Sequence, residues 1–159
     1  MEKIFGSLTS SIPSGGTEGV VSKSIKLYWN ERTVNGGKVL ELLFGDRKDT
    51  LAAARLLISR LKRSPHLAMT RREMRFFAKE LEGGKSGVKY SYHNFYVKLL
   101  RKLLDMGFIE KDVLIWDEKR KKTEAVYQIK LQGVPERPPQ GGFVKQAWLL
   151  AKGWNEYVK

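Results

Sequence analysis

The order of apolar and polar positions is most regular in residues 69–131, MTRREMRFFAKELEGGKSGVKYSYHNFYVKLLRKLLDMGFIEKDVLIWDEKRKKTEAVYQIKL. Apolar residues recur three and four positions apart, the spacing of a helix face, over 70–81 and again over 91–106. The pattern then changes to a short apolar run at 112–116 and to alternation at 123–131, both typical of strands. The stretch is therefore predicted to form two helices followed by a β-hairpin. The tip of that hairpin is the cationic run Lys119, Arg120, Lys121 and Lys122.

The helix expected at 91–106 has a signal at each end. Ser91 stands where an N-cap accepts a backbone N–H, and Gly107 stands where a left-handed residue ends a helix. At about 100° per residue, its apolar side chains form one broad face for the core. The opposite face carries a short polar side chain and then cations, about a turn apart: Asn94, Lys98 and Arg101, with Ser91 and Lys102 beside them.

The preceding helix opens on the capping box Thr70-x-x-Glu73. Arg71, Arg72 and Arg75 follow at once, although the positive end of a helix dipole disfavours cations. We interpret this arrangement as a sign that phosphate binds there, where the first backbone amides also point.

The link between the two helices, 82–90, contains GGKSG at 83–87. This run resembles a phosphate-binding loop, but it lacks the upstream glycine and does not lead from a strand into a helix, as such loops do. We interpret it as an exposed link whose lysines, Lys85 and Lys89, lie near a nucleic-acid backbone.

Two helices followed by a hairpin with a basic tip resemble the winged helix-turn-helix family of DNA-binding domains. The run LLRKLLDMGFIEK at 99–111 is similar to the usual exit from the recognition helix into the wing. The resemblance covers about residues 49–133 and rests on element order and pattern. It implies an α+β fold in which helix 91–106 enters the major groove of duplex DNA. The link at 82–90 is longer than the tight turn of the simplest members.

The resemblance also implies roles for individual residues. Asn pairs with adenine and Arg with guanine in the major groove, so the polar face of the helix would read bases. The base-reading candidates are Ser91, Asn94, Lys98 and Arg101. Cations of the helices, the link and the wing would hold phosphates and set the register. These are Arg71, Arg72, Arg75, Lys85, Lys89, Lys102, Lys119, Arg120, Lys121 and Lys122.

A flexible segment and a hairpin are expected before this domain, and one more helix at its start. Residues 1–19 are rich in Ser, Gly and Thr and predict a flexible N-terminal segment. Residues 20–48 predict an extra β-hairpin, with strands at 20–30 and 38–44 and a turn at Asn35-Gly36-Gly37. This hairpin would either extend the sheet of the wing or pair with a second subunit. A helix is expected to begin at Asp49 or Thr50 and to run to about Arg63.

A Pro/Gly linker at 134–142 is expected to lead into a C-terminal helix at 143–159. Trp148 and Leu149 fall outside the apolar face predicted for this helix. That face would dock either on its own hairpin or on a second copy of the chain, and the sequence leaves both open. The contacts of such a homodimer would be Phe143, Leu150, Trp154 and Tyr157.

Charge supports a polyanionic partner. The 159 residues carry a net charge of +13, and residues 51–111 alone hold 14 Lys and Arg against 5 Asp and Glu. Such an excess on the predicted helices favours nucleic acid as the partner. The alternative is a thermophile-like, lysine-rich surface that serves solubility.

The sequence gives no sign of catalysis or of membrane insertion. The chain has no cysteine, so disulfides, thiolate metal sites and a cysteine nucleophile are excluded. Its two histidines are isolated and its carboxylates lack metal-ligand spacing, so we expect no enzyme, cofactor or metal. No apolar run approaches the length of a membrane span, and no signal peptide is recognisable, so a cytoplasmic, nucleoid-associated location is expected.

The sequence therefore predicts a sequence-specific duplex DNA-binding protein, with transcriptional regulation as its role. A replication protein, or one that maintains a plasmid or a virus, would use the same fold. A single-stranded nucleic-acid binder is another alternative, with stacking residues Tyr28, Trp29, Tyr90 and Tyr92. A winged helix used only for protein contacts is the last, with Phe76, Trp148 and Trp154.

Overall fold

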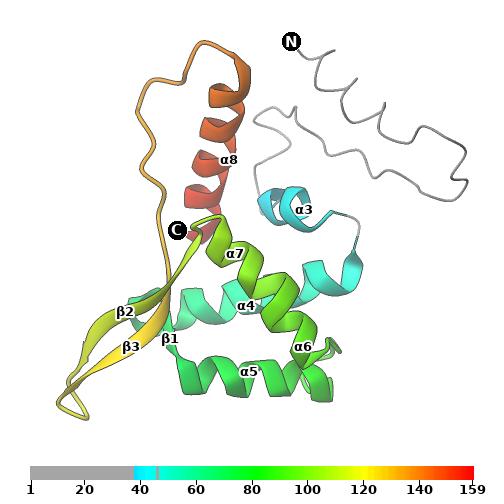
Figure 1. The fold of residues 1–159 in the computed structure, drawn as a ribbon, viewed down its shortest axis with the longest axis vertical. Coiled ribbons are helices and arrows are strands. Elements are labelled where there is room, and N and C mark those ends of the chain that lie inside the picture. Colours follow the sequence, from blue (N-terminus) through cyan, green and yellow to red (C-terminus); the bar gives the residue numbers. More distant parts are fainter. Residues whose placement is uncertain (1–37, 46) are drawn as a thin grey trace, which may run out of the picture.

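The computed structural model describes residues 38–45 and 47–159, which fold as α+β (Figure 1). The helices are α3 (Lys38–Phe44), α4 (Lys48–Arg63), α5 (Arg71–Gly83), α6 (Tyr92–Asn94), the π-helical η2 (Phe95–Leu100), α7 (Arg101–Asp105) and α8 (Gly142–Val158), with a short 3-10 turn η1 (Pro65–Leu67). The strands are β1 (Ala68–Thr70), β2 (Ile109–Asp117) and β3 (Lys122–Ile129). They form one antiparallel sheet in the order β1-β3-β2, and the whole arrangement is compatible with a winged helix.

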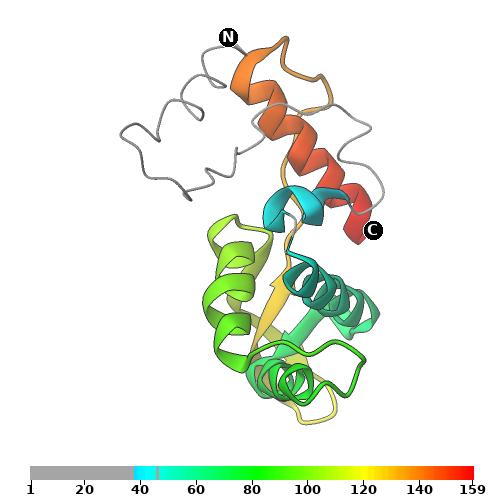
Figure 2. The same cartoon turned by 90° about the vertical axis from the view of Figure 1, so that its right-hand side faces the viewer.

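The core lies between α4, α5, the helical stretch formed by α6, η2 and α7, and one face of the sheet. We call α6, η2 and α7 together the 92–105 helix, because the backbone stays helical throughout. Figures 1 and 2 show α4, α5 and the 92–105 helix gathered around this core, with the β2–β3 hairpin projecting from one side. Residues fully buried there include Leu57, Leu61, Met74, Leu81, Phe95, Leu99 and Leu103.

The predicted caps of the two central helices are confirmed. The Thr70 hydroxyl accepts the Glu73 N–H at 3.1 Å, and the Ser91 hydroxyl accepts the Asn94 N–H at 3.3 Å. Gly107 has a φ of 75°, the left-handed conformation expected at the end of the 92–105 helix.

The start of α4 differs from the prediction. The helix begins at Lys48 after Arg47, so neither Asp49 nor Thr50 is its cap. Thr50 is instead buried, and its hydroxyl lies 3.2 Å from the hydroxyl of Tyr90. A side chain used in this tertiary hydrogen bond is not available to cap the helix that it lies in.

The expected N-terminal β-hairpin is wrong in its second half, because Lys38–Phe44 forms helix α3 rather than a strand. The buried side chains are Val39, Leu40, Leu43 and Phe44, and this three- and four-residue spacing puts all four on one side of a helix. A strand would divide them between two faces. The first half of that hairpin, 20–30, its turn at 35–37 and the segment 1–19 lie outside the described residues.

The sheet contains a strand that the sequence analysis missed. β1 is only three residues long and pairs with β3, with Met69 opposite Tyr127. Both side chains are buried, so this short strand closes the sheet against the core. The predicted β2–β3 hairpin is confirmed, with a β-bulge between Glu110 and Val113.

Helix α8 docks on its own chain. Trp154 is fully buried, its ring stacks on Phe108 at 4.5 Å between centroids, and its Nε1 donates to the Lys130 carbonyl at 2.9 Å. The predicted apolar face is wrong at several positions: Trp148 and Leu149 are buried, whereas Phe143 is 63% exposed. The linker explains part of this difference, because its Pro135 carbonyl accepts Trp148 Nε1–H at 2.8 Å.

None of the helices in the described ranges combines the length and the apolar content that crossing a bilayer requires.

Candidate nucleic-acid interface

A groove of about 460 Å³ lies where the start of α5, the 92–105 helix and the base of the β2–β3 hairpin meet. We call it the wing-side groove. Its lining residues are Arg71, Arg75, Tyr92, His93, Tyr96, Val97, Lys111 and Tyr127. The lining contains cations and aromatic rings and no carboxylate, which is the composition expected of a surface that binds a polyanion and its bases.

The β-bulge shapes one wall of this groove. Residues 111 and 112 together face a single residue of β3, and Asp112 has a φ of 60°. Bulges re-aim side chains, and here Lys111 joins the groove lining while Asp112 forms an ion pair with Arg71. That hydrogen bond, and then the carboxylate charge, raise the pKa of the Arg71 guanidinium. The pair ties the start of α5 to the hairpin.

Tyrosines form the floor of the groove. The rings of Tyr92 and Tyr96 lie 5.1 Å apart, and Tyr127 is buried beside them in the core. Burial, followed by the neighbouring Tyr92, raises the pKa of Tyr96 to about 12. Tyr96 is therefore a neutral phenol at physiological pH.

Replacing Tyr96 by Phe is expected to reduce the fall in folding stability that occurs at alkaline pH. The folded state holds the Tyr96 proton more tightly than the unfolded chain, whose tyrosine titrates near 10.0. The contribution of the protonated Tyr96 to the free energy of unfolding is therefore fully present below about pH 10 and is lost as the pH rises through about 12. Denaturant midpoints of both proteins, compared between about pH 8 and about pH 11.5, check this. Burial also raises the pKa values of Tyr127 and Tyr157, so the variant keeps part of the slope. An equal fall in both proteins would contradict the assignment.

The π-helical segment sets which residues of the 92–105 helix face the groove. A turn that closes from residue i to i+5 takes up more residues than an α-turn, so residues four apart lie nearly above one another. Arg101 N–H donates to the Tyr96 carbonyl, an i+5 bond of this kind. His93 and Val97 line the wing-side groove. Arg101 follows Val97 at the same four-residue spacing, which puts it on the same side of the helix. Its side chain is 71% exposed, and its Nε lies 3.8 Å from an Asp105 carboxylate oxygen.

The next row of this helix faces the other way, toward α3 and α4. Asn94 and Lys98 line a second groove, of about 320 Å³, together with Arg47 and Lys48 at the start of α4. Lys102 donates to the Leu43 carbonyl, and its ammonium lies 5.6 Å from the Phe44 ring centre. The structure therefore separates the four base-reading candidates: Asn94 and Lys98 line the second groove, Arg101 lines neither groove, and Ser91 caps the helix. Lys102, expected at the DNA backbone, is engaged with α3.

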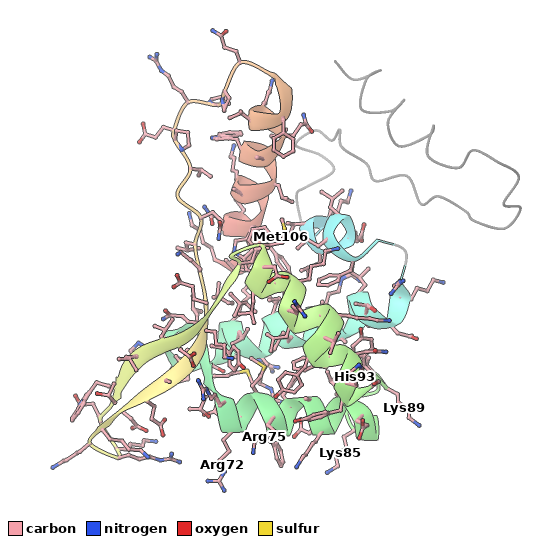
Figure 3. All side chains as sticks on the ribbon, viewed as in Figure 1. Arg72, Arg75, Lys85, Lys89, His93 and Met106 are labelled. Atoms are coloured by element: carbon pink, nitrogen blue, oxygen red, sulfur yellow. The ribbon has the colours of Figure 1, made fainter. Side chains whose placement is uncertain are left out.

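Cations also extend along α5 and the link. Figure 3 shows Arg72, Arg75 and Lys85 projecting from the lower edge of the molecule, and Lys89 from the far end of the link. Within the described ranges, neither Arg72 nor Arg75 forms an ion pair. Their charge is therefore available to a ligand.

The hairpin tip is only partly open. Arg120 contacts Glu124 at 2.8 Å and Asp117 at 3.9 Å, and Lys122 lies 3.6 Å from Glu124. Lys119 and Lys121 are exposed and form no ion pair in the part of the chain that the structure describes. Of the predicted tip cations, these two are the ones left to meet a phosphate.

Several residues of the groove were not predicted from the sequence. These are His93, Tyr96, Val97, Lys111 and Tyr127. The four-residue spacing of His93, Val97 and Arg101 was a usable signal, because residues four apart lie on the same side of a helix.

Other predicted contacts are altered by burial. Tyr90 is buried and hydrogen-bonded to Thr50, so it cannot stack on a base, and Tyr28 and Trp29 lie outside the described residues. Phe76 is 60% exposed, as its position on α5 predicted. Trp148 and Trp154 are buried in their own chain and are closed to a protein partner.

Among the described residues, no cluster of three or more His, Asp or Glu could hold a metal ion. Comparison of the chain with protein-family models, with curated proteins and with solved structures found no match.

Proposed function

We propose that the chain is a winged-helix protein that binds duplex DNA in a sequence-specific manner and regulates transcription. One observation carries the proposal: the wing-side groove joins the exposed row of the 92–105 helix, Arg71 and Arg75 of α5, and the base of the hairpin in one cationic surface. The element order and the sheet order β1-β3-β2 support the winged-helix assignment. A nucleoid-associated location in the cytoplasm follows from this role.

The proposal assigns base reading to the groove-facing row rather than to Asn94 and Lys98. Arg101 would pair with guanine, and the Val97 side chain, 45% exposed, would contact a thymine methyl group. His93 would read a third position from the same row. Arg72, Arg75 and Lys111 would hold phosphates and set the register of the helix in the major groove.

We propose a homodimer only through the residues of α8 that remain exposed, a smaller contact than the sequence predicted. Trp154 is buried against Phe108 and cannot serve a partner. A second copy would meet what remains exposed on α8, chiefly Phe143 and its neighbour Val144.

Selection of bound duplexes from a random pool tests the proposal directly. A recovered consensus, bound more tightly than a single strand of the same sequence, is the expected result. Tighter binding of the single strand would favour the stacking alternative and would contradict duplex recognition. Footprinting the site within its own genome would separate a promoter from a replication origin.

Replacing Arg101 by Ala is expected to cost about 1–3 kcal/mol on the selected duplex, all at one base position, with little effect on random duplexes. The reason is that a bidentate contact to a base is lost while the phosphate contacts remain. Titrations of the wild type and the variant against single-base changes of the site measure this. Arg137→Ala is the matched control, because Arg137 lies exposed on the linker. Equal weakening on all duplexes would show that Arg101 holds a phosphate.

A further inference from the structure

The β2–β3 hairpin carries an exposed apolar strip that the proposed base and phosphate contacts do not use. Leu114 is 71% exposed and Trp116 is 53% exposed. They are two residues apart on β2 and therefore lie on one face of the hairpin. On β3 they face Ala125 and Thr123, whose side chains are small. We call Leu114 and Trp116 the wing strip.

The wing strip continues the face of the sheet that floors the wing-side groove. Tyr127 lines that groove and is two residues from Ala125, so both lie on the face that carries the wing strip. Along the hairpin, Lys111 comes first, the wing strip follows, and Lys119 and Lys121 come last. Cations without an ion pair in the described ranges thus lie at both ends of an apolar surface.

The arrangement of apolar and positive residues indicates which kind of ligand the wing strip binds. A contiguous exposed apolar surface between positive ends fits a ligand that presents apolar surface between two rows of negative charge. The minor groove of DNA has this form, because its bases lie between two phosphate backbones. A protein partner would need an apolar patch with acidic residues at both ends, and the cationic groove beside the strip favours nucleic acid.

We propose that the wing strip enters the minor groove and wedges between two neighbouring base pairs, with Trp116 stacked on an exposed base face, so that the duplex kinks. The inference rests on the proposed function and adds distortion of the DNA to it. Figure 1 shows the β2–β3 hairpin projecting from the core. With the 92–105 helix in one groove, the hairpin would extend toward the adjoining groove. The energy lost on unstacking is offset by stacking on the indole ring. Flexible TA and CA/TG steps should therefore be preferred where the wing strip enters.

The test uses the full chain and a duplex selected from a random pool, with 2-aminopurine placed at successive positions and a dye at each end. The wild type is expected to raise 2-aminopurine fluorescence at one step and to shorten the distance between the dyes. Trp116→Ser should abolish both changes and weaken binding about tenfold, within the range that one base–aromatic stack gives. Trp116→Lys should abolish the fluorescence rise while an added cation maintains binding to random duplexes.

Leu131→Ser is the matched control, since Leu131 is an apolar residue with a similar exposure, 50%, and lies beyond the end of β3. It should leave the fluorescence rise and the bend unchanged. Duplex binding by the wild type without a fluorescence rise or a bend would overturn the wedge and leave the proposed function standing. Absence of duplex binding would overturn both. Loss of self-association in Trp116→Ser, with unaltered kinking, would assign the wing strip to a protein contact and overturn the wedge.

Discussion

Replacing Trp154 by Ala is expected to lower the free energy of unfolding by about 3–5 kcal/mol, the range for truncating a buried aromatic side chain. Trp154 is fully buried, and its indole fills the space between Phe108 and the end of β3. Its removal leaves a cavity and takes away the shorter of the two hydrogen bonds that the Lys130 carbonyl accepts, the other coming from Gln132 Nε2 at 3.2 Å. Urea denaturation of both proteins at one protein concentration measures the loss.

Two further variants separate the causes of this loss. Trp154→Phe keeps an aromatic ring against Phe108 but removes the N–H donor, so it should lie between the wild type and Trp154→Ala. Trp116→Ala removes a tryptophan that is 53% exposed and should change stability by less than about 0.5 kcal/mol. A loss for Trp154→Ala below about 1 kcal/mol would show that α8 is not docked as described.

The same measurement decides how α8 is used. In an intramolecular arrangement the denaturation midpoint does not depend on protein concentration, whereas a helix exchanged between two copies makes it rise with concentration. The burial of Trp154 within its own chain predicts the first result.

Local signals predicted the central helices well because their causes are local. Thr70 and Ser91 accept backbone N–H groups within three residues, and Gly107 supplies the left-handed conformation on its own. Elements whose secondary structure depends on contacts with residues far away in the sequence could not be predicted from such local signals. The segment 38–44 is short enough to satisfy both a two-residue and a helical period. Burial of Leu40 together with Leu43, three residues away, decides for the helix, because a strand would put these two side chains on opposite faces.

The sequence predicted which helices and which hairpin form the candidate site. It did not predict which side chains of the 92–105 helix face the groove. A broad apolar face keeps Phe95, Leu99 and Leu103 buried whether the turn is α-helical or wider, so the apolar pattern cannot reveal the π-helical segment. The polar rows are sensitive to that difference, because one extra residue in a turn moves later side chains sideways around the helix. Arg101 was therefore grouped with Asn94, although it does not line the groove of Asn94 and its four-residue spacing from Val97 puts it on the side of His93 and Val97.

Changing Arg72, Arg75 and Lys111 together to Gln is expected to have the largest effect on DNA binding. Each forms no ion pair among the described residues, so each is free to displace a counterion from a phosphate. Each phosphate contact contributes about 0.9 to the slope of log affinity against log salt, so the slope should fall by about 2.7. Extrapolated from 1 M salt, this corresponds to about 500-fold in affinity at about 0.1 M.

The matched control changes Arg137, Lys145 and Lys159 to Gln, which removes the same charge from the linker, from α8 and from the residue that follows α8. Both triple variants reduce the net charge of +13 equally, so any difference between them reports where the phosphates lie. Binding to a random duplex across a series of salt concentrations is sufficient, because phosphate contacts do not depend on sequence. A slope near the wild-type value in the control and a reduced slope in the groove variant place the backbone at the wing-side groove. Equal slopes in the two variants would mean that binding depends on the net charge and not on where the cations lie. That result would contradict the assignment of the wing-side groove as the DNA interface.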